Sequence, residues 1–240
     1  MPKNKKSTST DPDTAKAGRK KRARNAANPA QSAAQSEQAS PSAADKEKGF
    51  FIVGMGASAG GLEAFEQFFS HIPPDNGMAF VLIQHILPDY KSIMADILKK
   101  YTTMKVFEIE DGMQIEPNCV YVKPPNKDVT ISDRILHLAE IPASQRLKHP
   151  IDFFSQSLAK DQADRAICII LSGMGTDGAI GLKAIKDTGG MSMVQEEKSA
   201  KFGGMPTSAM STGLADYILP AERMPEKLIE YTKYHHKIWN

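Results

Sequence analysis

Apolar runs that alternate with helical patterns limit what this chain can fold into. Three of the runs end at a polar or glycine-rich loop, and a helical pattern follows each loop. Parallel strands need helical crossovers, so such alternation is typical of a parallel sheet with helices on both faces. We therefore expect an α/β fold with a doubly wound, mostly parallel sheet. The three runs lie at 51–53, 79–83 and 166–171.

The loops after these runs carry side chains suited to chemistry. Ser58 follows the first run, His85 the second, and Asp177 lies in the glycine-rich loop after the third. Since ligands bind outside the carboxyl ends of the strands in such a sheet, we expect the three to meet in one crevice. They can act as nucleophile, base and orienting carboxylate in acyl transfer, with Nε2 of His85 facing the serine oxygen.

Shorter patterns complete the expected fold. Two runs separated only by Asp133-Arg134 predict a short β-hairpin insertion at 129–132 and 135–138. Period-3.6 patterns predict helices at 62–69, 92–101, 151–160, 179–187 and 223–234. Strands are expected at 50–54, 79–84, 105–109, 119–122, 166–171, 191–195 and 217–219.

The first 48 residues differ from the rest in composition. They contain no Val, Ile, Leu, Phe, Tyr or Trp. Such a segment cannot bury enough apolar area to offset its ordering entropy, so we expect 1–48 to be a disordered basic tail and 49–235 to be one domain. The tail carries a net charge of +6, and because the whole chain carries +2, the remaining residues carry −4.

The tail has a basic cluster at 19–24, which suits either a solubilising linker or contact with an anionic partner, the linker being favoured. The chain has neither the apolar region of a secretion signal nor about 18 consecutive apolar residues, so we expect a cytoplasmic protein with no membrane insertion. Cys119 and Cys168 lie in apolar runs, which favours reduced core thiols. We expect no metal and no cofactor.

The loop after the first run fits two motifs. The letters GASAG at 56–60 match a nucleophile elbow, in which small neighbours expose a serine on a sharp strand-to-helix turn. The letters GMGASA at 54–59 match a permitted form of the dinucleotide fingerprint. That fingerprint needs an acidic residue at the end of the next strand, which ends in Gln84-His85 instead. The nucleophile elbow is therefore favoured.

Asp177 also has two interpretations. It can orient His85, or it can cap the helix expected at 179–187, a common use of aspartate. The two uses are compatible at a strand-end loop. Other histidines lack this placement, and structural or surface roles are expected for His71, His137 and His149.

Four separated motifs make the chain resemble the catalytic domain of the chemotaxis receptor protein-glutamate methylesterases, the CheB type. They are GASAGG at 56–61, QH at 84–85, LSGMGTDG at 171–178 and GMP at 204–206. The resemblance implies a doubly wound α/β enzyme that hydrolyses glutamate γ-methyl esters on chemoreceptor helices and releases methanol. In many members it also implies deamidation of selected glutamines.

The resemblance also implies residue roles. Ser58 resembles the family nucleophile, His85 its general base, and Asp177 the carboxylate that orients the histidine. Met174 resembles a methionine beside the site whose backbone N–H helps bind the oxyanion. From its place at the start of the helix after Ser58, the Ala59 N–H is expected to stabilise the oxyanion as well. The implied partners are methylated chemoreceptor helices and, in hybrid proteins, a receptor methyltransferase domain, with no specific nucleic acid.

Two features depart from the family pattern. Many members have threonine after the serine, where this chain has Ala59, so any role of that hydroxyl is absent or replaced. The usual enzyme also has an N-terminal receiver domain, which residues 1–48 cannot supply. The alternative function is a catalytically weak binding or regulatory module of the same fold.

Overall fold

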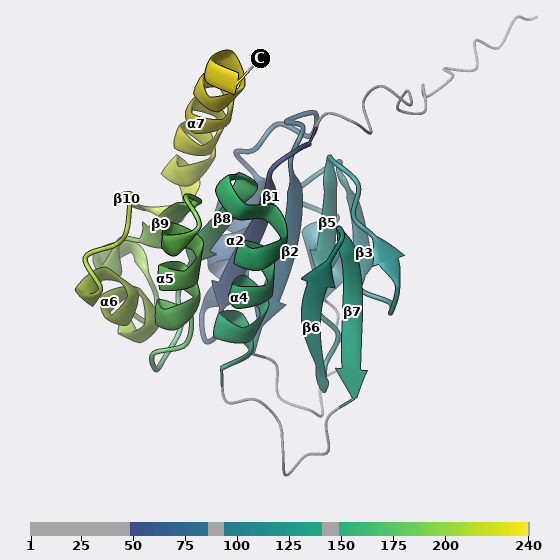
Figure 1. Cartoon of the computed structure of the whole chain (residues 1–240). Coiled ribbons are helices and arrows are strands. Elements are labelled where there is room, and N and C mark those ends of the chain that lie inside the picture. The colour runs from purple at the N-terminus through teal and green to yellow at the C-terminus, as the bar shows by residue number, and fades with distance from the viewer. Residues whose placement is uncertain (1–48, 86–93, 141–148, 240) are drawn as a thin grey trace, which may run out of the picture. The chain divides into compact units, whose positions relative to one another are not determined.

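A seven-stranded sheet forms the centre of the computed structural model, which describes residues 49–85, 94–140 and 149–239 (Figure 1). The strand order is β10-β9-β8-β1-β2-β5-β3, and every neighbouring pair is parallel. The strands are β1 (Ile52–Ala57), β2 (Ala79–Gln84), β3 (Lys105–Glu108), β5 (Cys119–Val122), β8 (Ala166–Ile170), β9 (Met191–Gln195) and β10 (Tyr217–Leu219). The chain winds outward from β1 in both directions, so the carboxyl ends of β8, β1 and β2 form a topological switch point, where ligands bind in such sheets.

Helices cover both faces of the sheet (Figure 1). One face packs against α2 (Gly61–Phe69), α3 (Met94–Leu98) and α7 (Met224–Trp239), and the other against α4 (Pro150–Gln162), α5 (Ala179–Asp187) and α6 (Gly204–Ser211). Short 3-10 turns lie at Ala163–Arg165, Glu197–Ser199 and Ala221–Arg223. The expected doubly wound α/β fold is confirmed. The expected tail at 1–48, with its basic cluster, and the start of the helix expected at 92–101 lie outside the described residues.

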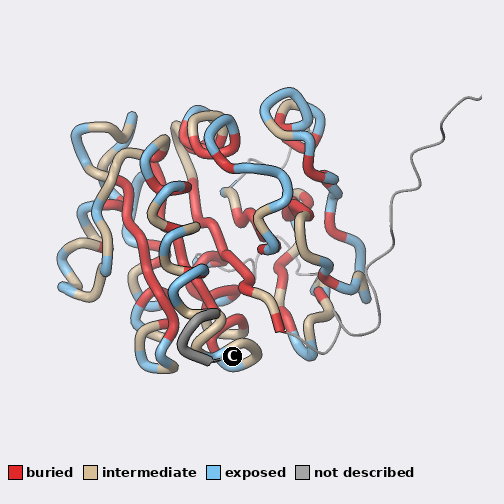
Figure 2. Tube along the Cα trace, turned by 90° about the horizontal axis from the view of Figure 1, so that it is seen from above, coloured by how far each residue is buried: buried red, intermediate tan, exposed pale blue. Residues whose placement is uncertain are grey.

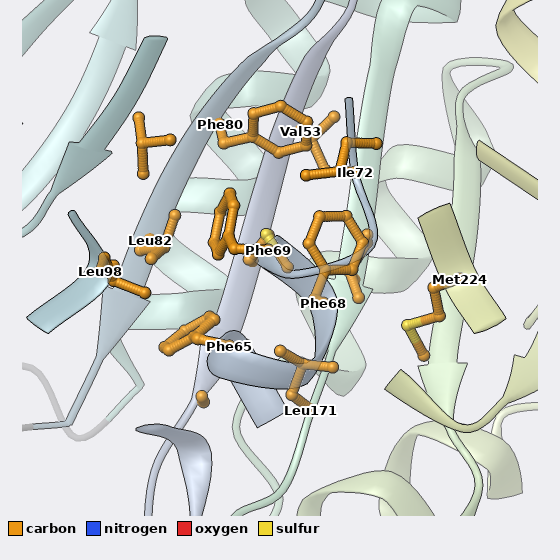
Figure 3. Packing of buried hydrophobic residues seen from close by; sticks show 14 of the residues in the cluster. Val53, Phe65, Phe68, Phe69, Ile72, Phe80, Leu82, Leu98, Leu171 and Met224 are labelled. Atoms are coloured by element: carbon orange, nitrogen blue, oxygen red, sulfur yellow. The ribbon is translucent and has the colours of Figure 1, made fainter. Parts of the chain in front are cut away.

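Aromatic packing fixes α2 on the sheet. Phe65, Phe68 and Phe69 recur at helical spacing, and all three are buried (Figure 3). The ring of Phe80 on β2 lies 5.8 Å from that of Phe68 and 5.6 Å from that of Phe69, both edge to face. The central strands are buried along their lengths (Figure 2). The turn between β1 and α2 is therefore anchored in the core at both ends.

A second, three-stranded sheet contacts α4. It consists of β4 (Met113–Gln114), β7 (Ile135–Glu140) and β6 (Lys127–Ser132), paired antiparallel in the order β4-β7-β6. The expected hairpin is present, and both turn residues, Asp133 and Arg134, have the positive φ that a type I′ turn requires. The two residues of β4 are too few to show an alternating pattern, so the sequence did not predict that strand.

The position of β1 differs from the prediction in a way that matters for the site. The strand expected at 50–54 runs from Ile52 to Ala57, because it pairs with β2 along its whole length. A Cβ atom on Gly56 would lie 2.5 Å from Ile151 Cγ2, so glycine lets α4 pack directly on the strand. Ser58 is thus the first residue after β1.

The described helices include none with both the length and the apolar character that a membrane span requires.

Candidate active site

Three strand ends bring the candidate residues to one edge of the sheet. Ser58 follows β1, His85 follows β2, and Asp177 lies in the loop between β8 and α5. Backbone hydrogen bonds join the loops: the Ser58 N–H donates to the Ser172 carbonyl (3.0 Å), and the His85 N–H donates to the Ala57 carbonyl (3.1 Å). A cavity of about 1070 Å³ opens here, lined by Ser58, Ala59, Gly60, Leu62, Glu63, Glu66, Gln84, His85, Met174 and Lys201.

His85 and Asp177 share a short hydrogen bond. Nε2 of His85 lies 2.6 Å from Oδ2 of Asp177. The Asp177 side chain is only 4% exposed, whereas that of His85 is 33% exposed. The imidazole therefore stands between a buried carboxylate and the cavity.

Two backbone groups also donate to Asp177. The Ile151 N–H donates to Oδ2 (3.0 Å), and the Asp152 N–H donates to Oδ1 (2.9 Å). Burial raises the pKa of the Asp177 carboxyl, but hydrogen bonds from His85 and from the two N–H groups outweigh burial and hold this pKa below its ordinary value of 3.8. Asp177 is therefore an anion at neutral pH and only accepts hydrogen bonds.

This contact corrects the expected orientation of the imidazole. Nε2 was expected to face the serine oxygen, but it binds Asp177. Because β1 separates β2 from β8 in the sheet, His85 must extend across β1 to the loop after β8, and its distal ring nitrogen, Nε2, makes the contact. Because an ionised carboxylate has no proton to donate, Nε2 carries the hydrogen, and in the neutral imidazole Nδ1 then keeps a lone pair.

Asp177 does not cap the helix that follows it. The N-cap residue of α5 is Gly178, which has a φ of 99° and forms no side-chain cap. The Asp177 carboxylate binds the first turn of α4 instead. The capping interpretation is therefore wrong for α5.

Glycine residues make room for Ser58. Gly60, the N-cap residue of α2, has a left-handed φ of 74°. A Cβ atom on Gly173 would lie 2.9 Å from Ser58 Cβ and 2.2 Å from Met205 Sδ. Ser58 and His85 are both described, and no hydrogen bond joins Ser58 Oγ to the imidazole. Hydrogen bonds between a nucleophile and its base commonly tighten only when substrate binds.

We expect Gly173→Ala to displace Ser58. The added methyl group has no space between Ser58 and the buried Met205, so either the loop or the serine must shift. Misplacement of a reacting group by about 1 Å costs on the order of 100-fold in rate, and overpacking costs about 1–3 kcal/mol of stability. Turnover assays and thermal melts of the purified variant measure both effects. Unchanged turnover would show that the loop adjusts without moving Ser58.

The backbone N–H groups of Ala59 and Met174 are available to a ligand. Within the described part of the chain, neither donates to a backbone acceptor. Both residues line the cavity, and the Met174 side chain is 63% exposed. Backbone N–H groups that make no other hydrogen bond can stabilise a developing negative charge. The oxyanion roles of Ala59 and Met174 stay predictions.

One cluster has the spacing of metal ligands. Ligand atoms of His149, Asp152 and Asp177 lie within 4.8 Å of one another. Both carboxylates, however, already accept hydrogen bonds from backbone N–H groups, and Asp177 also accepts one from His85. These contacts favour a structural role, and the absence of a metal stays a prediction.

The sequence analysis did not single out Asp152. An acidic residue in the first turn of a helix is common because it faces the positive end of the helix dipole. Its position therefore gave no sign that Asp152 contacts the loop after β8, more than 20 residues away.

Comparisons with known proteins show the family to which the chain belongs. A family model described as CheB methylesterase matches residues 53–228. The protein-glutamate methylesterase/protein-glutamine glutaminase 1 of Xanthomonas campestris pv. campestris is 34% identical over 182 residues, which is 74% of this chain and 51% of that protein. The corresponding protein of Hydrogenovibrio crunogenus is 32% identical over 186 residues, 76% of this chain and 49% of that protein. The chain spans about half the length of these curated relatives.

A solved structure shares the fold. The crystal structure of the Thermotoga maritima CheB methylesterase catalytic domain matches with a TM-score of 0.70 and 30% sequence identity. The match covers 77% of this chain and 100% of that one. Sequence and structure thus agree over the region that contains the sheet and the cavity, and the chain belongs to the CheB methylesterase family.

Proposed function

We propose that this chain is a serine esterase that hydrolyses γ-methyl esters of glutamate on chemoreceptor helices and releases methanol. The observation that carries the proposal is the 2.6 Å hydrogen bond between His85 Nε2 and the buried Asp177, with His85 and Ser58 lining the same cavity. Serine esterases use such an orienting carboxylate and a neutral imidazole to activate the hydroxyl of a serine. The names of the relatives supply the substrate class.

The reaction proceeds in two halves. Ser58 Oγ attacks the ester carbonyl carbon while His85 Nδ1 takes the hydroxyl proton, and Asp177 stabilises the imidazolium. The tetrahedral intermediate collapses, the bond to the methoxy oxygen breaks, and that oxygen takes the proton from His85 and leaves as methanol. Water then attacks the acyl group and passes a proton to His85, which returns it to Ser58 as the glutamate is released. The N–H groups of Ala59 and Met174 bind the oxyanion in both halves.

The charge of the cavity favours turnover of a neutral ester. Glu63 and Glu66 line it, and Lys201 Nζ lies 3.7 Å from Glu63 Oε2. The substrate ester carries no charge, whereas the product is a carboxylate that these acids repel. The same attack on a glutamine amide would release ammonia, and the relatives' names include protein-glutamine glutaminase.

Methanol release from a methylated chemoreceptor cytoplasmic fragment tests the proposal. We expect wild-type protein to release methanol and to leave free glutamate at the methylated positions, as mass spectrometry detects. The same fragment with glutamine at those positions tests ammonia release. A well-folded wild-type protein that hydrolyses neither substrate would support the regulatory-module alternative.

We further propose that residues 49–235 form the catalytic domain of a cytoplasmic enzyme, with 1–48 outside it. Removing 1–48 should change the melting temperature little, since that segment contains no Val, Ile, Leu, Phe, Tyr or Trp to pack. Thermal melts of the full chain and of the fragment 49–240 measure this. A decrease of roughly ten degrees, several kcal/mol for a domain of this size, would show that the segment docks.

A further inference from the structure

Two neighbouring helices, α4 and α5, begin without side-chain caps of their own. They lie side by side on one face of the sheet (Figure 1). The N-cap residue of α4 is His149 and that of α5 is Gly178, and neither forms a side-chain cap. The first N–H groups of both helices therefore need acceptors from elsewhere in the chain.

Each helix receives its acceptor from the segment that begins the other. Asp177, which directly precedes α5, accepts from the N–H groups of Ile151 and Asp152 in the first turn of α4. Asp152 on α4 accepts in return from the N–H groups of Gly178 (2.9 Å) and Gly181 (2.7 Å), both at Oδ1. Asp152 and Asp177 are both buried. The exchange fixes the two helix starts against each other.

Close packing leaves this junction little freedom. A Cβ atom on Gly181 would lie 2.6 Å from Ser155 Cβ and 3.1 Å from Asp152 Cα. The starts of α4 and α5 thus touch almost backbone to backbone. A carboxylate that bridges them sets where the loop carrying Asp177 can lie.

The junction also distributes charge. Burial raises the pKa of Asp152, with the nearby Asp177 carboxylate adding to that increase, whereas the pKa of Asp177 is lowered. The positive ends of two helix dipoles meet at this point and offset the burial of the acidic pair. The more stable negative charge is therefore that of Asp177, which contacts His85.

We propose that Asp152 is a positioning residue, whose carboxylate oxygen holds the start of α5 so that Asp177 Oδ2 meets His85 Nε2. This inference rests on the proposed esterase function and names a residue through which the His85–Asp177 pair is held. In this proposal Asp152 acts through one carboxylate oxygen, which accepts hydrogen bonds from two N–H groups. A substitution that removes this acceptor should therefore have a different effect from one that removes only the negative charge.

The test compares Asp152→Ala with Asp152→Asn. Asp152→Ala deletes the acceptor, and we expect kcat to fall about 10- to 100-fold while KM changes less than about threefold, since geometry and not binding is lost. The amide oxygen of Asp152→Asn can still accept from Gly178 and Gly181, so this variant should recover most of kcat.

Asp161→Ala is the matched control. Asp161 lies near the other end of α4, and its carboxylate also accepts two backbone N–H groups, those of Asp133 and Arg134. Asp161 is less buried than Asp152, so its loss should lower stability by a smaller amount, and it should leave kcat unchanged. Equal kcat values for the two alanine variants would overturn the proposal, as would an Asp152→Asn variant no more active than Asp152→Ala.

A spectroscopic signal separates this proposal from the proposed function. The proton between His85 Nε2 and Asp177 should give a far-downfield ¹H NMR resonance, which requires no substrate. We expect the resonance in wild type, Asp152→Asn and Asp161→Ala, and its shift or loss in Asp152→Ala. If wild type shows the resonance but no esterase activity, only the proposed function fails. If Asp152→Ala does not fold, absence of the resonance from folded Asp152→Asn overturns the inference.

Discussion

Ser58→Ala is expected to abolish ester hydrolysis and to leave the fold intact. Removing the nucleophile of a serine hydrolase costs on the order of 10⁶-fold in turnover, and the remaining rate comes from binding and oxyanion stabilisation. Ser58 is half-buried at the cavity wall, so removal of one oxygen atom creates no cavity in the core. Methanol release and thermal melts of wild type and variant measure the two expectations.

Ser70→Ala is a matched control for this substitution. Ser70 follows the other end of α2, and its exposed hydroxyl donates to the Glu66 carbonyl. It should retain wild-type turnover.

The effects of substituting residues that act as a unit are strongly non-additive. Ser58→Ala combined with His85→Ala should therefore lower turnover little more than either single variant does. More than about a tenth of wild-type activity in Ser58→Ala would remove Ser58 from the mechanism.

Asp177→Asn is expected to cost about 10⁴-fold in turnover, as the equivalent change does in a serine protease. An amide stabilises an imidazolium far less than a carboxylate does. If its NH₂ group faces His85, the imidazole must accept at Nε2 and carry its hydrogen on Nδ1, the nitrogen needed as the base. The His85 proton then lies on the wrong side of the ring.

The surroundings of Asp177 also predict a loss of stability. Donors approach both of its oxygens: the Asp152 N–H at Oδ1, and the Ile151 N–H with His85 at Oδ2. Either orientation of an asparagine amide points its NH₂ group at a backbone N–H. One unmade buried hydrogen bond costs about 1–3 kcal/mol, or several degrees of melting temperature.

Asp161→Asn separates the two effects of Asp177→Asn. It places an amide where two backbone N–H groups also converge, at a less buried position, so it should lose some stability while keeping wild-type turnover. Near-normal turnover in folded Asp177→Asn would leave a Ser58–His85 dyad as the working site.

The strand-end positions of the candidate residues could be predicted because they depend on local pattern. An apolar run followed by a small or polar loop indicates where a buried parallel strand ends, and β2 was predicted with the bounds that the structure has. The order of the strands is not local. Whether β8 lies beside β1 depends on packing between distant segments, and with it the choice of imidazole nitrogen that reaches Asp177.

The contacts of Asp152 and Asp177 with each other's helices were beyond sequence analysis for the same reason. An aspartate one residue before a glycine and a helix fits an ordinary local cap. Gly181 permits α4 and α5 to approach each other closely. Because of this approach, each carboxylate accepts hydrogen bonds from N–H groups at the start of the other helix and not from its own.

The parallel pairing of β1 with β8 also bears on how the chain acquires activity. His85 and Asp177 are 92 residues apart in the chain, and the Ser172 hydroxyl bonds to the Ala59 carbonyl across 113 residues. Contacts of such high sequence separation form slowly, because the entropy of closing a long loop is lost before the contact repays it. A nascent chain that has made β1, α2 and β2 therefore holds a serine and a histidine without their carboxylate. Under the proposed function, hydrolysis therefore requires β8 to have paired with β1.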